Sequence, residues 1–333
     1  MKKSDKPRVV VVTGASAGVG RATVRAFAAE GAHVAAIARD TEGLHAAARE
    51  VDESGGRGLA VPVDVADAGQ MEAAAARIES ELGPIDVWVN NAMVTIFARV
   101  IDTTPGEFKR ATEVTYLGTV YGTMAALRRM QPRNSGSIIQ VGSALAYRSI
   151  PLQAAYCGAK HAIAGFTDSL RTELIHEQSR IRLTMVQLPA MNTPQFTWCR
   201  SKMPRHPQPV PPIFQPEVAA ERIVWASRHN RREVFVGAPT VIAIETNKVA
   251  PALADLYLGK TGFDSQQTEE ALSPARPDNL FEPLPGDFGA HGVFDAQAHN
   301  AAATTWLANH KGVAAAGAAA LGIVTYAMKK KAS

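Results

Sequence analysis

The chain has 333 residues, of which 46% are hydrophobic and 20% charged, and its 35 basic against 31 acidic residues give a net charge of +4. The apolar content excludes a wholly disordered chain, and a mean hydropathy of −0.06 excludes a polytopic membrane protein. The small, scattered charge gives no reason to expect nucleic acid as a partner. Two cysteines are too few for a disulfide framework, which indicates a reducing, cytoplasmic setting.

Short apolar runs alternate with helical patterns along the chain. The first run, residues 9–12, consists of valines, which is typical of a strand covered on both faces and too short for the core of a secretory signal. Further strands are predicted at residues 33–38, 58–63, 85–89, 137–141, 181–188 and 233–236. Helices are predicted at residues 18–30, 41–51, 66–82, 108–130, 154–176, 217–229 and 241–258. The alternation predicts an α/β fold, a doubly wound Rossmann-type parallel sheet flanked by helices.

A glycine-rich turn joins the first predicted strand to the first helix. Gly14, Gly18 and Gly20 have the spacing G-x-x-x-G-x-G, and Ser16 and Val19 lie within the same turn. Glycines at such a place let backbone N–H groups and a helix N-terminus approach a pyrophosphate. Three glycines also fit a plain turn, but the position after the first strand favours dinucleotide binding.

The end of the second predicted strand bears on the choice of dinucleotide. An acidic residue there would hold the ribose 2′-hydroxyl of NAD, whereas this chain has Arg39. The planar fork of an arginine matches a 2′-phosphate, so the sequence favours NADP, with NAD as the alternative because Asp40 follows. A solvated arginine at a strand end is the plainer interpretation.

A serine, a tyrosine and a lysine form the second constellation. Tyr156 and Lys160 are four residues apart near the start of a predicted helix, so they share one face, and Ser143 follows a predicted strand. An ammonium group beside a phenol lowers the phenol pKa toward working pH, which general acid–base catalysis requires. A serine hydroxyl can donate to a carbonyl oxygen. The set therefore predicts acid–base chemistry at a carbonyl or alcohol.

With these motifs the chain resembles the short-chain dehydrogenase/reductase family over roughly residues 7–240. The matching positions are Gly14, Gly18, Gly20, Asp64, Val65, Asn90, Asn91, Ala92, Ser143, Tyr156, Lys160, Pro189 and Thr193. The resemblance implies an oxidoreductase that interconverts a carbonyl and a secondary alcohol, and a homo-oligomer, a dimer or tetramer built through the helix that carries Tyr156.

The resemblance also implies a role for each matching residue. Tyr156 would exchange a proton with the substrate oxygen, Lys160 would hold the nicotinamide ribose, and Ser143 would orient the carbonyl. The remaining matches would contact the cofactor: Asp64 and Val65 its adenine, Asn90 and Ala92 its riboses, and Pro189 and Thr193 its nicotinamide side.

Two residues depart from the family pattern. Met93 stands where a glycine is usual, and Thr115 aligns with an asparagine that completes the proton relay behind the lysine. A threonine can hold a water molecule but lacks the amide geometry. We expect a working enzyme with an altered relay, and a catalytically weakened nucleotide-binding regulatory or scaffold protein is the alternative.

A proline-rich insert follows the predicted strand at residues 181–188. Its Met191, Phe196, Trp198 and Phe214 would either cover a lipophilic substrate or form a small core beneath a long loop. The histidines show no spacing of metal ligands, so no metal site is predicted.

The predicted catalytic domain comprises residues 1–258. The sequence after residue 258 contains no second glycine loop. Residues 259–304, rich in glycine and proline, are predicted to be a linker or a surface wrap, and residues 305–333 an apolar, alanine-rich helix with a lysine-rich end. The uncharged part, residues 312–328, would measure about 25 Å as a helix, below the roughly 30 Å of a bilayer core. Membrane association through this segment and docking on the protein remain alternatives.

Overall fold

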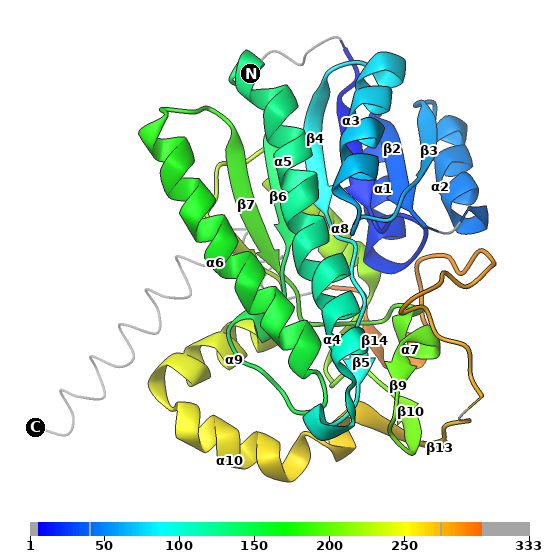
Figure 1. Cartoon of the computed structure of the whole chain (residues 1–333), viewed down its shortest axis with the longest axis vertical. Coiled ribbons are helices and arrows are strands. Elements are labelled where there is room, and N and C mark those ends of the chain that lie inside the picture. Colours follow the sequence, from blue (N-terminus) through cyan, green and yellow to red (C-terminus); the bar gives the residue numbers. More distant parts are fainter. Residues whose placement is uncertain (1–5, 40, 274, 302–333) are drawn as a thin grey trace, which may run out of the picture.

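A seven-stranded parallel sheet forms the centre of the protein in a computed structural model, whose structure describes residues 6–39, 41–273 and 275–301 (Figure 1). The strand order is β12-β7-β6-β4-β1-β2-β3. The strands are β1 (Val9–Thr13), β2 (His33–Ala38), β3 (Gly58–Pro62), β4 (Ile85–Asn90), β6 (Ser137–Val141), β7 (Arg182–Gln187) and β12 (Glu233–Phe235). The predicted α/β fold with a doubly wound parallel sheet is confirmed.

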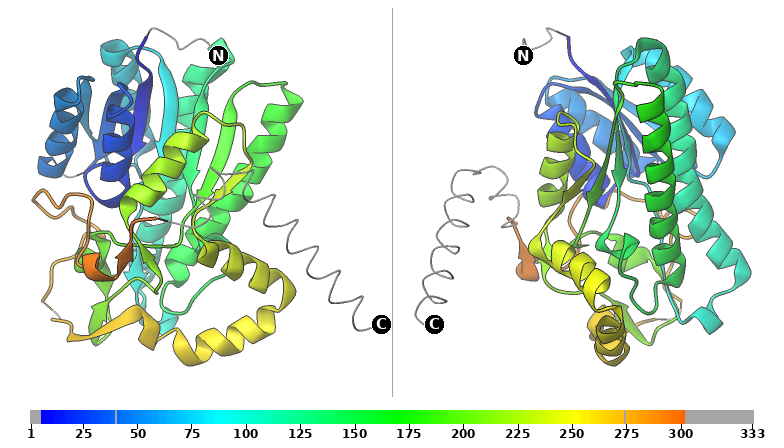
Figure 2. Two further views of the ribbon diagram at one scale, coloured as in Figure 1. Left: turned by 180° about the vertical axis from the view of Figure 1, so that it is seen from behind. Right: turned by 90° about the vertical axis from the view of Figure 1, so that its left-hand side faces the viewer.

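Two helical layers cover the sheet because alternate residues of each strand point to opposite faces. On β1, Val9 and Val11 pack toward one layer and Val10 and Val12 toward the other. The first layer consists of α3 (Ala68–Leu82), α5 (Gly118–Met130) and α6 (Ala154–His176), and the second of α1 (Gly18–Ala28), α2 (Glu42–Glu53) and α8 (Pro216–Ala226). The right-hand view of Figure 2 shows the sheet between these layers.

Two predicted helices are divided in the structure. The helix expected over residues 108–130 consists of α4 (Pro105–Thr112), a π-helical turn (Glu113–Leu117) and α5. The helix expected over residues 241–258 is split into α9 (Ala238–Val249) and α10 (Pro251–Thr261), because Pro251 begins a new helix and Ala250, which is not helical, separates the two.

The insert pairs within itself, with the segment after β4 and with the segment after α10, near the carboxyl ends of the central strands (Figure 1). The pairs are β5 (Ile96–Phe97) with β9 (Arg200–Ser201), β10 (Arg205–Pro207) with β13 (Gln267–Ala271), and β11 (Ile213–Phe214) between β8 (Ala190–Met191) and β14 (Ala298–His299). Short helices complete the chain: α7 (Gln195–Trp198) and the single turns Val100–Asp102, Gln131–Arg133, Ala144–Ala146, Asp264–Gln266 and Asp295–Gln297.

Within residues 6–39, 41–273 and 275–301, we find no helix long and apolar enough to cross a membrane. The apolar segment at residues 312–328, on which the expected membrane association depends, lies outside the described residues.

Candidate active site

A cavity of about 950 Å³ lies at the carboxyl ends of the central strands, where doubly wound sheets bind their ligands. Residues that follow six of these strands contribute to its wall. Most of the predicted site residues line this cavity: Gly14, Ser16, Gly18, Val19, Arg39, Asp64, Val65, Ala92, Ser143, Tyr156, Lys160, Pro189 and Thr193.

The glycine turn forms a tightly packed cradle at one side of the cavity. Gly14 and Gly18 have φ angles of +65° and +59°, in the left-handed region that disfavours residues with side chains. A Cβ atom on Gly14 would lie 2.8 Å from Ala92 Cα, and one on Gly18 3.2 Å from Thr193 Cβ. Helix α1 begins here without a side-chain cap. The turn and the helix N-terminus therefore fit a pyrophosphate group.

Two arginines, Arg39 and Arg110, lie near each other at one end of the cavity. Arg110 on α4 pairs with Asp64 at 2.5 Å, but Arg39 forms no ion pair within the part of the chain that the structure describes. Arg39 instead donates to the backbone carbonyls of Asn279 and Phe281. Burial lowers the pKa of Arg39 below its usual value, and the neighbouring Arg110 cation lowers it further. This end of the cavity is therefore electrostatically suited to an anionic group.

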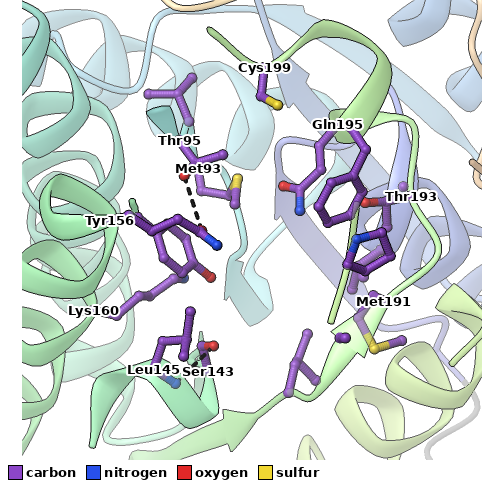
Figure 3. A pocket seen from close by; sticks show the side chains of 18 of the residues that line it. Met93, Thr95, Ser143, Leu145, Tyr156, Lys160, Met191, Thr193, Gln195 and Cys199 are labelled. Atoms are coloured by element: carbon purple, nitrogen blue, oxygen red, sulfur yellow. Dashed lines mark hydrogen bonds between the residues drawn. The ribbon is translucent and has the colours of Figure 1, made fainter. Parts of the chain in front are cut away.

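Ser143, Tyr156 and Lys160 meet at the other end of the cavity (Figure 3). The Lys160 Nζ atom lies 5.5 Å from the centre of the Tyr156 ring and donates to the carbonyl of Val141 at 2.7 Å. The Ser143 Oγ atom accepts from the backbone N–H of Leu145 at 3.1 Å. Three of the four predicted catalytic side chains are thus brought together by α6 and the turn after β6, and the fourth, Thr115, does not line the cavity.

The pKa values in this group are governed by burial. Lys160 is only 3% exposed, and burial lowers its pKa to about 8. Burial raises the pKa of Tyr156 above its ordinary value, and the hydrogen bond with Ser143 opposes this rise. The sequence predicted a net lowering by Lys160, but the ammonium group is directed to the Val141 carbonyl. The Tyr156 hydroxyl is therefore protonated at neutral pH.

Three predicted site residues do not line the cavity: Gly20, Asn90 and Thr115. The fully buried Thr115 hydroxyl donates to the Val94 carbonyl at 3.1 Å and lies 3.2 Å from the Val94 nitrogen, from which it accepts. The Asn90 amide is bonded to side chains of β4, α5 and β6. A Cβ on Gly20 would lie 2.0 Å from the carbonyl oxygen of Gly14, so this glycine is required for packing.

Sequence reasoning missed a buried polar group in the wall of the cavity. Gln153 lies 3.3 Å from the Thr95 hydroxyl that donates to it, and it donates to Gln266 at 2.7 Å. All three side chains are buried and line the cavity or lie against it. Gln266 lies in a segment without periodicity, more than a hundred residues away, so no local signal could have placed it here.

The aromatic residues of the insert divide between the two predicted roles. Phe196 packs in a small core with Phe97 and Phe294 and also lines the cavity, and Trp198 lines the cavity with its ring edge-on to Phe288. Phe214 belongs to the main core instead. Phe196 and Trp198 therefore add apolar surface to the wall of the cavity.

The comparisons with known proteins agree with this architecture. The family model described as short chain dehydrogenase matches residues 8–203. An uncharacterized oxidoreductase of Bacillus subtilis, YxnA, is 34% identical over 284 residues, covering 84% of this chain and 79% of that protein. Dehydrogenase/reductase SDR family member 7B of Bos taurus is 36% identical, and the match covers 54% of this chain and 56% of that protein.

Solved structures lead to the same family. A short-chain dehydrogenase from Streptomyces avermitilis aligns with a TM-score of 0.65 and 26% identity, covering 78% of this chain and 98% of that one. A metagenomic short-chain oxidoreductase, solved in complex with NADP, aligns with a TM-score of 0.57 and 27% identity, covering 69% of this chain and 96% of that one. With the match to the family model over most of the sheet, the chain belongs to the short-chain dehydrogenase/reductase family.

Proposed function

We propose that the protein is an NADP-dependent oxidoreductase that interconverts a carbonyl and a secondary alcohol on an apolar small molecule. The observation that carries the proposal is that one cavity joins the glycine cradle, Arg39 and the pair Ser143 and Tyr156. A dinucleotide along this cavity would present its nicotinamide, which supplies or takes up the hydride, near the tyrosine.

Each part of the cavity suits one part of the cofactor. The cradle and the α1 N-terminus would hold the pyrophosphate, Arg39 the 2′-phosphate, and Asp64 and Val65 the adenine. Lys160 and Ala92 would contact the nicotinamide ribose, and Pro189 and Thr193 the carboxamide side. The preference for NADP is supported by Arg39, a half-buried guanidinium that has only backbone carbonyls as partners among the described residues.

The chemistry at the substrate would be general acid–base catalysis by Tyr156. Its protonated hydroxyl donates a proton to the carbonyl oxygen in reduction, and the resulting phenolate takes one back from the alcohol in oxidation. The Ser143 hydroxyl would hold the same oxygen by a hydrogen bond. The buried Lys160 would supply positive charge that stabilises the phenolate as it forms, which offsets the rise in the Tyr156 pKa caused by burial.

The wall of the substrate half supports an apolar substrate. Met93, Leu145 and Met191 lie around the catalytic group in Figure 3, and Trp198 and Tyr257 line the same cavity. Burial of apolar surface at roughly 25 cal/mol per Å² would favour a substrate of matching shape. Gln153 is a polar group in the lining of this cavity and would select substrates that carry a further hydrogen-bonding atom.

The test is NADPH oxidation by the full chain with a panel of ketones and aldehydes that range from small and polar to long and apolar. We expect turnover that rises with the apolar surface of the carbonyl compound, and weaker activity with NADH. Tight NADPH binding without oxidation by any member of the panel would contradict the proposal and favour a regulatory protein on the same fold.

A further inference from the structure

A segment of the carboxyl-terminal part crosses the cofactor half of the cavity from outside. We call residues 278–295 the strap; in Figure 1 it is the orange trace near α7. Asn279, Leu284, Gly286 and Phe288 of the strap line the same cavity as the glycine turn. The strap is therefore an outer wall of the proposed dinucleotide site, formed by residues far from the glycine turn in sequence.

Three successive carbonyls attach the strap at the adenosine end. Arg39 donates from Nη1 to the Phe281 carbonyl at 2.7 Å and from Nη2 to the Asn279 carbonyl at 2.5 Å. Arg110 donates from Nε to the carbonyl of Leu280 between them, at 3.2 Å. The Leu280 side chain is fully buried in the core of the catalytic domain. The position of these carbonyls is thus fixed by packing as well as by hydrogen bonds.

A second set of contacts attaches the strap at the pyrophosphate end. The backbone N–H of Gly18 donates to the Gly289 carbonyl at 3.0 Å, and Arg21 pairs with Asp287 at 3.2 Å. The strap thus runs from the arginines that face the adenosine to the turn that faces the pyrophosphate. Any dinucleotide in this cavity lies beneath it.

The two terminal nitrogens of Arg39 are the atoms that an arginine uses to bind two oxygens of a phosphate. In the structure both nitrogens already donate to strap carbonyls. Each terminal nitrogen carries two N–H groups, so a 2′-phosphate at Arg39 would either share these nitrogens with the strap carbonyls or displace the carbonyls, whereas the 2′-hydroxyl of NAD would not compete for them in this way. A carbonyl is a neutral acceptor and a phosphate a doubly charged one, so the phosphate forms the stronger bonds.

We propose that the strap sets the cofactor preference: the carbonyls of Asn279 and Phe281 compete with the 2′-phosphate of NADP for Arg39, and Leu280 is the positioning residue that holds them there. The strap lowers the affinity for NADP and leaves that for NAD nearly unchanged. This inference rests on the proposed binding of the 2′-phosphate by Arg39.

The experiment measures the dissociation constants of NADPH and NADH by fluorescence titration of the full chain. Leu280→Ala removes the buried side chain that packs the strap against the core. Asp278→Ala changes a residue outside the core: it removes the carboxylate that accepts hydrogen bonds from the backbone N–H of Leu280 and from Arg200. We expect each variant to lower the ratio Kd(NADPH)/Kd(NADH) about fivefold or more, the range of a net hydrogen bond to a charged group. Because both dissociation constants change alike when a variant loses contacts that NADPH and NADH share, such losses do not change the ratio.

His291→Ala is the matched control, because His291 pairs with Glu217 at the far end of the strap. It is expected to leave the ratio unchanged. In an Arg39→Ala background the effect of Asp278→Ala on the ratio should vanish, because the shared donor is gone. A ratio that stays constant in both Leu280→Ala and Asp278→Ala would overturn the inference. If Arg39→Ala alone left the dissociation constant of NADPH at its wild-type value, the proposed cofactor site itself would be refuted.

Discussion

Lys160 carries an ammonium group that folding removes from water. It is 3% exposed and donates a hydrogen bond to the Val141 carbonyl, and no carboxylate is paired with it among the described residues. Burial therefore lowers its pKa to about 8. Folding must desolvate this ammonium group at neutral pH, so Lys160 destabilises the folded state there. A residue kept at such a cost to stability is typical of a functional site.

The lowered pKa of Lys160 predicts that the free energy of unfolding depends on pH. Lys160 binds its proton up to about pH 8 in the folded state and up to about pH 10.4 in the unfolded state, so the unfolded state binds more protons between these values. The free energy of unfolding of the wild type, relative to Lys160→Met, should rise on the order of 2 kcal/mol from pH 8 to pH 10. Denaturant titrations at several pH values measure it.

The exposed Lys109 provides the control for this series, since Lys109→Met removes a cation from the surface of α4. Its stability difference from the wild type should show no comparable slope between pH 8 and pH 10. If the difference for Lys160→Met were flat as well, the lysine would not be desolvated as described.

Among the elements, the π-helical turn between α4 and α5 carries Thr115, the residue that departs from the family pattern. The turn places the fully buried Thr115 hydroxyl on both backbone polar groups of Val94, in the segment that follows β4. The hydroxyl thereby satisfies a donor and an acceptor that have no strand partner there. Its structural role is clear, and we infer that any relay behind Lys160 does not depend on an asparagine at this position.

Two substitutions at this turn separate structure from turnover. Thr115→Val removes the hydroxyl and should lower the free energy of unfolding by about 1–3 kcal/mol, because the Val94 groups lose their partner. Thr115→Asn should change kcat by less than about tenfold, if the natural relay is intact. Steady-state kinetics and denaturant unfolding check both. A gain of about a hundredfold in kcat for Thr115→Asn would show that the natural relay is impaired.

The elements also show where sequence reasoning succeeds. The valines of β1 predicted a strand buried on both faces because alternate residues must then meet two apolar layers, as Val10 and Val11 do. The glycine turn was predictable because its positive φ angles leave few alternatives. Pro251 begins α10 and so separates it from α9. The sequence predicted one continuous helix there because the helical periodicity continues on both sides of the proline.

At the scale of the whole molecule, the strap marks the limit of such reasoning. The sequence predicts the carboxyl ends of the strands as a site because parallel strands bring their ends to one edge. It cannot predict that Arg39 meets Asn279, because these two residues are 240 positions apart and the strap has neither periodicity nor motif. The same holds for Gln266, which reaches Gln153 only through the fold.

The measurement that tests the account most directly is the turnover of Tyr156→Phe with NADPH and the best carbonyl substrate of the panel. The substitution removes only the hydroxyl, and Tyr121→Phe, at a tyrosine packed against the core, is the matched control. We predict that Tyr156→Phe lowers kcat by at least about 100-fold, the usual contribution of a general acid, while NADPH still binds and Tyr121→Phe keeps normal turnover. An unchanged kcat in Tyr156→Phe would contradict the assignment of Tyr156 as the proton donor.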